Sequence, residues 1–367
     1  MHMLQPRILA EGMYSIEDVV SLKTHFPIWE ERDIYQAQLR ELFEITHPEL
    51  LYASDREARQ EAFVRERMLK TRAGILGGSW VYFPWSGELL HTLSEKELYQ
   101  VRTNRNRNLI TTDEQTQLSA ATIGVIGLSV GSGVATALTY SGIGSTYKIA
   151  EFDTLETTNL NRIRTRLGKV GATKLSIVAE QMYDVNPFVR IIPFSSGLTK
   201  EVLEKFVCGE PRPRVIFEII DSFEMKVHLR ELARRERIPV IMVTNLGDRV
   251  LLDVERYDVS SETPLFNGRA GTVPRDMLEK PDVTPEQKHA YAVSLAGVQH
   301  IPERALASVE QIGKTLVGRP QLSSTVTVAT GLCSYLARQI VLGNSTLSGS
   351  WLINFDVLFS PITRLSL

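Results

Sequence analysis

Apolar residues change their spacing about a third of the way along the chain, and this change divides the sequence into two parts. Up to about Lys70 they recur at helical spacing among many charged residues, with a break at His47-Pro48. Further on, short apolar runs alternate with amphipathic stretches. We therefore predict a mainly helical N-terminal extension over residues 1–110 and a second domain over residues 111–367.

The second domain opens with the pattern of a β-α-β unit. ATIGVIG has the character of a buried strand, SGVATALTYSG of a helix built from small residues, and TYKIAEFD of a second strand. Further strands are predicted at VRIIPFS, at RVIFEIID, which ends at Asp221, and at PVIMVTN, with helices between them. This alternation predicts an α/β fold, with a Rossmann-like, mostly parallel sheet and flanking helices.

An aromatic segment, GGSWVYFPWSGELLHTL, lies between the two parts of the chain. Gly78 and Pro84 favour short strands or loops here rather than a helix. Two interpretations stay open: the aromatic side chains pack the extension onto the second domain, or they form a surface that contacts substrate.

Composition narrows the classes of function. The 367 residues have a formal net charge of -2, with both signs mixed along the chain, so no overall field favours nucleic acid or an anionic membrane. Cys208 and Cys333 lie far apart, which argues against a disulfide scaffold and gives no reason to expect zinc. Without an apolar run of about 18 residues or a signal-peptide pattern, we expect a soluble cytoplasmic protein.

The first strand runs into a turn rich in glycine and serine, GVIGLSVGSG. Gly127, Ser129 and Ser132 let backbone N–H groups approach phosphate oxygens at the N-terminus of a helix. The dinucleotide fingerprint is met only in part, because serines replace its later glycines. This turn alone suits a nicotinamide cofactor and ATP about equally.

The segment after the second strand favours ATP. Glu151 and Asp153 end that strand, and TLETTNLNRIR follows at the edge where open α/β sheets bind ligands. A dehydrogenase needs only the first carboxylate, for the ribose. Arg162 offers a donor fork to phosphate and Lys174 a mobile positive charge, while Asp221 supplies a hard oxygen ligand for Mg²⁺.

Together these segments resemble the ThiF/E1 adenylating family. That family has a glycine-rich turn, D-x-D-x-V-x-x-S-N-L-x-R-Q, a G-x-x-K step and a later strand ending in T-D-N. Here GLSVGS, EFDTLETTNLNR, GATK and IDS stand in that order, and the resemblance extends from about Asn104 to the C-terminus. It departs from the pattern at Glu151, which replaces the usual aspartate, and at Ile163, which replaces the usual glutamine.

The resemblance implies a role for each matching residue. Glu151 would hold the ribose, and Asp153 would support the metal and the phosphates. Asn159, Arg162 and Lys174 would grip the triphosphate, with Asp221 on Mg²⁺. An arginine ahead of the first strand reaches into the partner's site in many family dimers; Arg107 stands at that position, with Arg105 as the alternative.

The resemblance also implies the reaction and the partners. A substrate carboxylate would attack the α-phosphorus of Mg·ATP, and pyrophosphate would leave an acyl-adenylate. We expect an adenylyltransferase that is a homodimer, with a peptide or small-protein substrate docked on the N-terminal extension. Maturation of a ribosomally made peptide, as in the microcin and pantocin branch, is the first expectation. Activation of a ubiquitin-like or sulfur-carrier protein is the alternative, and a nicotinamide-dependent oxidoreductase is the rival class.

Overall fold

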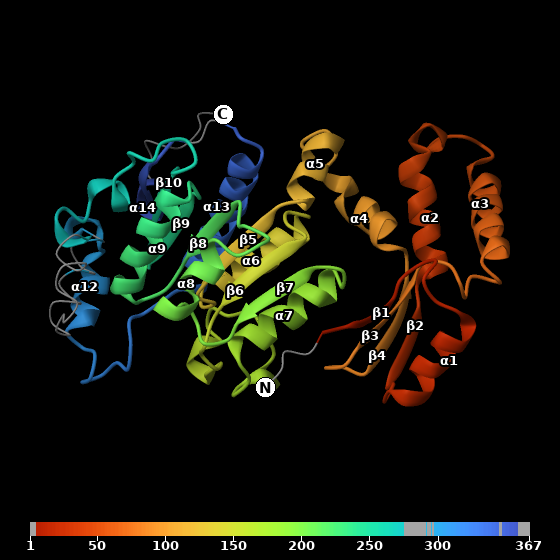
Figure 1. Ribbon diagram of the computed structural model, residues 1–367, viewed down its shortest axis with the longest axis horizontal. Coiled ribbons are helices and arrows are strands. Elements are labelled where there is room, and N and C mark those ends of the chain that lie inside the picture. Colours follow the sequence, from red (N-terminus) through yellow and green to blue (C-terminus); the bar gives the residue numbers. More distant parts are fainter. Residues whose placement is uncertain (1–4, 275–290, 292–294, 296, 345–346, 359–367) are drawn as a thin grey trace. The chain divides into compact units, whose positions relative to one another are not determined.

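The apolar runs of the second part form one sheet in the computed structural model, which describes residues 5–274, 291, 295, 297–344 and 347–358. The strands are β5 (Thr122–Ile126), β6 (Thr146–Ala150), β7 (Arg190–Phe194), β8 (Val215–Glu218), β9 (Val240–Leu246), β10 (Arg249–Glu255) and β11 (Gly349–Asn354). Their order is β11-β10-β9-β8-β5-β6-β7 (Figure 1). The five strands from β9 to β7 are parallel, whereas β10 and β11 are antiparallel additions at one edge. The prediction of a Rossmann-like, mostly parallel sheet is confirmed.

Helices flank this sheet because the strands are apolar on both faces. They are α6 (Gly131–Tyr140), α7 (Lys174–Val185), α8 (Lys200–Val207), α9 (Phe223–Arg235), α12 (Glu303–Val309), α13 (Ser323–Val341) and α14 (Phe355–Leu358). Phe206 of α8 and Met225 of α9 share one core with Ile216 and Met242 of the sheet. Thr330 of α13 packs closely against Gly133 of α6. We conclude that α8 and α9 cover one face of the sheet and that α6 and α13 cover the other. Right-handed crossovers on either side of β5 require this arrangement.

The N-terminal extension contains helices and a small sheet of its own. Its helices are α1 (Ile16–His25), α2 (Tyr35–Thr46), α3 (Arg56–Lys70) and α4 (Glu95–Thr103), followed by α5 (Thr112–Ser119). Its strands are β1 (Arg7–Leu9), β2 (Glu30–Asp33), β3 (Ser79–Phe83) and β4 (Glu88–Thr92), in the order β1-β3-β4-β2. The short strands expected in the aromatic segment are thus β3 and β4. No pattern in the sequence predicted β1 or β2.

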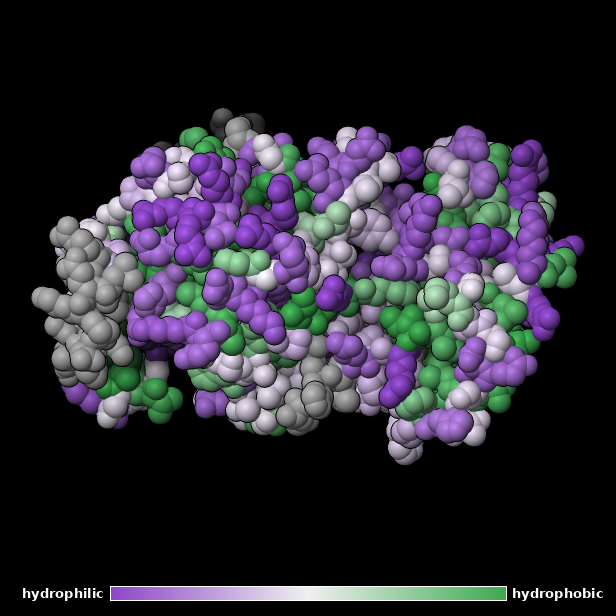
Figure 2. Space-filling view, viewed as in Figure 1, coloured by the Kyte–Doolittle hydropathy of each residue, from purple (hydrophilic) through white to green (hydrophobic). Residues whose placement is uncertain are grey.

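The chain folds as two compact units. Unit 1 comprises Met1–Gln115, Tyr140–Gly142 and Glu180–Val189, and unit 2 comprises Thr116–Thr139, Ile143–Ala179 and Arg190–Leu367. The carboxyl-terminal half of α7 thus belongs to unit 1. Figure 2 shows the hydrophilic surface over α8 and α9 of unit 2. Charged side chains of both signs line an open groove there, including Lys200, Glu204, Glu231 and Arg235.

The aromatic side chains of β3 are core residues of unit 1. Trp80, Tyr82 and Phe83 are buried, and Trp80 and Tyr82 pack with Val19 and Leu22 of α1. These three rings therefore belong to the core of unit 1 itself, which differs from the predicted packing onto the second domain. Among the described residues, no helix is both long enough and apolar enough to cross a membrane.

Candidate active site

Gly127 fixes the start of the glycine-rich turn at the carboxyl end of β5. Its φ is +85°, and a Cβ atom on it would lie 2.0 Å from the carbonyl oxygen of Ile219. Its N–H donates to the carbonyl of Ala150, at the end of β6, over 2.9 Å. Only glycine combines a positive φ with such a close approach to the Ile219 carbonyl. The turn is therefore pinned between the ends of β6 and β8.

The two serines of the turn are held close to the predicted phosphate-binding segment. Ser132, in the first turn of α6, is buried, and its Oγ donates to the carbonyl of Ser129 over 3.1 Å. Ser129 Oγ accepts a hydrogen bond of 3.2 Å from Nε of Arg162. The structure thus brings Ser129, Ser132 and Arg162 together.

Glu151 braces the glycine-rich turn. Its Oε2 accepts from the backbone N–H of Leu128 over 2.7 Å, and its Oε1 accepts from the N–H groups of Phe152 and Asp153 over 2.8 and 2.9 Å. The side chain is buried, so these bonds satisfy most of its acceptor capacity. Nothing in the sequence indicated this bracing role, because it depends on how the two strand ends meet.

Asp153 and Lys174 form an ion pair beside the turn. Lys174 Nζ lies 2.7 Å from Oδ2 of Asp153, and the lysine is buried while the aspartate side chain is 47% exposed. The backbone fixes the pair as well, since the N–H of Lys174 donates to the carbonyl of Asp153 and that of Leu155 to Ala172. A positive and a negative charge therefore stand together where α7 begins.

Asn159 shapes the segment that carries Arg162. It is buried at the end of a 3-10 turn, Thr157–Asn159, and its Oδ1 accepts from the N–H of Glu156 over 3.2 Å. Arg162 Nη1 donates to the carbonyl of Thr158 over 3.3 Å and to Oδ1 of Asn161 over 2.9 Å. These bonds aim the guanidinium at the turn.

Asp221 lies beyond the end of β8 and not at its tip, which corrects the predicted strand boundary. The strand ends at Glu218 because the Glu218 carboxylate accepts the N–H of Ile220 over 3.0 Å and interrupts the ladder. Asp221 is exposed. Burial lowers the pKa of the Arg162 guanidinium, and the negative charge of Asp221 acts in the opposite direction. Arg162 and Asp221 therefore share one electrostatic environment.

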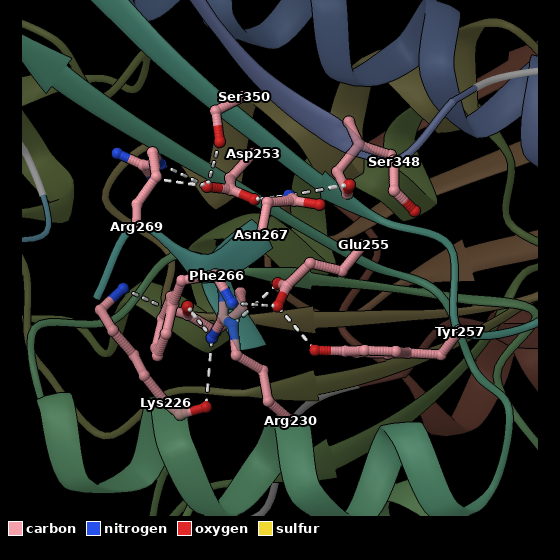
Figure 3. Close-up of polar contacts among 12 residues, drawn as sticks. Lys226, Arg230, Asp253, Glu255, Tyr257, Phe266, Asn267, Arg269, Ser348 and Ser350 are labelled. Atoms are coloured by element: carbon pink, nitrogen blue, oxygen red, sulfur yellow. Dashed lines mark hydrogen bonds and ion pairs between the residues drawn. The ribbon is translucent and has the colours of Figure 1, made fainter. Parts of the chain in front are cut away.

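Behind Asp221 lies a buried ionic network that the sequence did not reveal (Figure 3). The Glu218 carboxylate pairs with Nζ of Lys226 over 2.6 Å and with Nη1 of Arg230 over 2.8 Å. Arg230 Nε in turn pairs with Oε2 of Glu255 over 2.8 Å, and Tyr257 donates its hydroxyl to Glu255 over 2.6 Å. Glu218 is thus a structural anchor and not an isolated charge at a strand end. The network joins β8, α9 and β10.

The network is closed by the segment after β10. The ring of Phe266 lies 4.0 Å below the Arg230 guanidinium, and its backbone N–H donates to Glu255 over 2.7 Å (Figure 3). Asp253 lies two residues before Glu255, on the same face of β10. Its carboxylate accepts from Arg269 over 2.5 Å and from Ser350 over 3.0 Å (Figure 3). These contacts fasten residues 266–269 and β11 to the sheet.

The remaining predicted residues lie elsewhere or are inert. Arg105 and Arg107 are exposed and belong to unit 1, so an action of either in a partner's site stays a prediction. Cys333 is buried in α13, where burial raises the pKa of its thiol to about 12. Burial also raises the pKa of Cys208. Among the described residues, no three His, Cys, Asp or Glu side chains cluster as metal ligands. His2 and His289 fall outside the described residues.

Comparison with known proteins identifies several similar ones. The profile of the ThiF family matches residues 103–365. An uncharacterized protein of Mycobacterium tuberculosis is 34% identical over 297 residues, which are 80% of this chain and 41% of that protein. The tRNA threonylcarbamoyladenosine dehydratase of Bacillus subtilis is 26% identical over 179 residues, covering 48% of this chain and 68% of that enzyme.

One solved structure supports the fold. The crystal structure of PaaA aligns with a TM-score of 0.51 and 19% identity, covering 71% of this chain and 79% of that one. At this identity the likeness concerns the arrangement of helices and strands. The chain spans about two fifths of the length of its mycobacterial relative, 41%.

Proposed function

The chain belongs to the ThiF family of ATP-dependent adenylating enzymes, and from that premise we propose that it adenylates a carboxylate of a peptide or small protein. A carboxylate oxygen attacks the α-phosphorus of ATP, the bond from that phosphorus to the oxygen bridging to the β-phosphorus breaks, and pyrophosphate leaves. The product is an acyl-adenylate. Positioning and charge neutralisation suffice for this step, because a carboxylate is already ionised at pH 7.

The observation that carries the proposal is that two predicted ligands of ATP, Glu151 and Arg162, both bond to the glycine-rich turn. Arg162 donates to Ser129 of the glycine-rich turn, and Lys174 stands in the first turn of α7, paired with Asp153. In our proposal the triphosphate replaces Ser129 as the partner of Arg162 and Asp153 as the partner of Lys174. Glu151 then uses its remaining acceptor capacity for the ribose, and Asn159 keeps the segment in place.

Two carboxylates suit a magnesium ion here. Mg²⁺ is usually held by one or two protein carboxylates together with substrate phosphates and water, and so does not need a preformed protein cluster. Asp221 is exposed and its charge acts on Arg162, and Asp153 is half exposed and pairs with Lys174. We assign these two residues to Mg²⁺, which would neutralise charge on the phosphates.

Exchange of radiolabelled pyrophosphate into ATP tests the reaction, because acyl-adenylate formation is reversible. Asp221→Asn is expected to reduce exchange by about 100-fold or more while the melting temperature stays the same, since a carboxylate ligand is lost at an exposed position. The matched control is Asp258→Asn, a change in a carboxylate distant in the chain and paired with Arg256. Release of ADP and phosphate, or unchanged exchange in Asp221→Asn, would contradict the assignment.

Unit 1 is our proposed docking region for an extended peptide. β2 lies at an edge of its sheet and pairs in parallel with β4. The N–H groups of Glu30 and Ile34 donate to the carbonyls of Gly87, just before β4, and His91 of β4. Because bonding alternates along a strand, the backbone groups of Glu31 and Asp33 point away from β4. Such an edge accepts a further strand through main-chain hydrogen bonds.

A pair of substitutions at Glu31 tests this docking. Glu31→Pro removes the outward N–H, which edge positions tolerate, and Glu31→Ala removes the same side chain but keeps the N–H. We expect Glu31→Pro alone to raise the KM for a peptide substrate by about tenfold, with ATP affinity unchanged. Equal effects of the two substitutions would show that the edge does not bind peptide.

A second candidate substrate is a carboxylate carried on a tRNA nucleoside. The similarity to the tRNA threonylcarbamoyladenosine dehydratase of Bacillus subtilis favours it, although that match covers 48% of this chain. Pyrophosphate exchange stimulated by total tRNA, and not by peptides or by ubiquitin-like proteins with a free C-terminus, would select it. Binding of NADH would instead support the rival function, a nicotinamide-dependent oxidoreductase.

A further inference from the structure

One buried amide has no partner. Asn245 lies in β9, and its Oδ1 and Nδ2 atoms are both buried without a hydrogen bond in the part of the chain that the structure describes. Leaving such groups unpaired costs about 1–3 kcal/mol each. Buried polar groups are almost always satisfied, so an unpaired amide requires an explanation.

The position of Asn245 relates it to the candidate active site. Glu218 of β8 and Met242 of β9 form the last pair of these two parallel strands. Asp221 and Asn245 each follow three residues later. Asp221 therefore lies beyond the carboxyl end of β8, and Asn245 is the second-last residue of the adjacent parallel strand β9. Both are at the edge where open α/β sheets bind ligands.

The face of the sheet on which Asn245 lies follows from alternation. Met242 belongs to the core that contains Met225 of α9. Side chains alternate along a strand, so Asn245 is on the opposite face, together with α6 and α13. The glycine-rich turn leads into α6 on that face.

The N-terminus of α13 lies at the same edge. Thr325 in its first turn donates to the carbonyl of Gly247, two residues after Asn245, over 2.8 Å. Arg164 donates to Thr327 over 2.9 Å, and Asn161 to the carbonyl of Gln321 over 2.8 Å. The segment that carries Arg162 therefore reaches α13 beside Asn245.

This helix end has a free capacity for negative charge. α13 is 19 residues long, and Leu322 at its N-cap position provides no side-chain hydrogen bond. Exposed N–H groups and the helix dipole at such an end attract a carboxylate. The unpaired amide is the independent sign that a ligand belongs here.

We propose that Asn245 binds the carboxyl-terminal residue of the substrate, with Nδ2 donating to the carboxylate and Oδ1 accepting from the amide N–H of that residue. A carboxamide presents a donor and an acceptor side by side, which complements a peptide unit. A simple carboxylic acid offers only acceptors and leaves Oδ1 unpaired. This inference rests on the adenylation proposed above and names the chemistry that its substrate must carry.

Two small acids of the same shape test the assignment. N-acetylglycine has an amide N–H next to its carboxylate, and levulinate has a CH₂ group in the same place. Their affinities are measured by ligand-observed NMR in the presence of Mg²⁺ and α,β-methylene-ATP. We expect the wild type to bind N-acetylglycine about tenfold more tightly. Asn245→Leu should bring the ratio close to one.

Thr244→Val is the matched control, since Thr244 is the neighbouring residue on the other face of β9, and it should keep the tenfold ratio. The melting temperature of ligand-free Asn245→Leu should not fall, because an apolar side chain of similar shape removes two unpaired groups. A lower melting temperature would assign the amide to structure and overturn the proposal. So would equal binding of the two acids, a preference that survives Asn245→Leu, or binding of neither acid.

Pyrophosphate exchange with the same acids separates this proposal from the reaction. A preference for N-acetylglycine without any exchange would overturn adenylation and keep the role of Asn245. Exchange at equal rates with both acids, together with equal binding, would keep adenylation and overturn the role of Asn245.

Discussion

Nη1 of Arg230 lies 2.8 Å from Oε2 of Glu218, and neither side chain has any exposed surface. Lys226 and Glu255 complete a row of alternating charges around this pair. Glu218 ends β8 and receives the N–H of Ile220, so the pair also sets where the chain leaves the sheet toward Asp221. The network therefore links the stability of unit 2 to the geometry of its candidate site.

Glu218→Gln is expected to lower the free energy of unfolding by about 3–5 kcal/mol. The substitution keeps the shape but takes the Glu218 carboxylate away from two buried positive charges, of which Arg230 keeps its pair with Glu255 and Lys226 keeps no ion pair among the described residues. Urea unfolding followed by circular dichroism measures the change. The control is Glu231→Gln, because Glu231 pairs with Arg234 at the surface, where ion pairs contribute about 0–1 kcal/mol.

The difference in stability between wild type and Glu218→Gln should depend on pH. Burial alone would raise the pKa of Glu218, but the charges of Lys226 and Arg230 outweigh burial, and the net pKa is lowered. A carboxyl group with a lowered folded-state pKa stabilises the fold above its unfolded pKa of about 4.3 and loses this contribution as the pH falls. The stability gap between wild type and Glu218→Gln should stay constant from about pH 7 to 5 and close below about pH 4. A gap that widens on acidification would contradict the ion pairs.

Gly127→Ala is expected to destabilise the protein by about 2–4 kcal/mol and to abolish ATP binding. The residue has a φ of +85°, and its Cβ would meet the Ile219 carbonyl at 2.0 Å, so β5 and β8 must separate. Gly168→Ala is the matched control, because a Cβ atom there meets nothing within 4 Å. Melting temperature and titration with ATP test both variants, and intact ATP binding in Gly127→Ala would show that the turn does not hold the nucleotide.

Trp85→Ala is expected to lower stability by about 2 kcal/mol. The ring stacks on Tyr183 at 5.9 Å, and its Nε1 donates to Asp184 over 3.1 Å. These contacts hold the loop after β3 to the end of α7, within unit 1. If Trp85 instead serves only as an anchor for substrate, the melting temperature will stay unchanged and the KM for a peptide will rise.

Mixing two inactive variants tests the proposed homodimer. Arg107→Ala and Asp221→Asn subunits should each lack activity, but random hybrid dimers contain one site with both groups intact. Half of the dimers are then hybrids with one working site in two, so about a quarter of the wild-type exchange should return. Two copies of Asp221→Asn mixed in the same way provide the baseline. A monomer in sedimentation, or no recovery on mixing, would refute action in trans.

Strands and helices with a strong pattern were predictable from the sequence. β5, α6 and β6 stand where the apolar runs placed them, because these strands are buried on both faces. β2 was missed, since its sequence EERD is wholly exposed and has no apolar position to reveal a strand. Its pairing depends on β4, more than fifty residues away in the chain.

The residues of the candidate site also divide into those that were predictable from the sequence and those that were not. Residues such as Arg162 and Lys174 were identifiable because the spacing of their segments resembles that of a family. Glu218, Arg230 and Glu255 were not, because charged residues in a sequence usually indicate surface, and their partners are brought together only by the fold. The unpaired amide of Asn245 likewise has no signature in the sequence, since it is defined by what surrounds it.

The open edge of β2 also determines which strands it rejects. Glu30, Glu31 and Asp33 place three negative charges on four residues, and Arg32 the single positive one. A second copy of the same edge would bring these charges face to face, so self-pairing into aggregates is disfavoured. A strand rich in lysine or arginine meets no such repulsion. The edge therefore disfavours pairing with a second copy of β2 and can still pair with a basic strand.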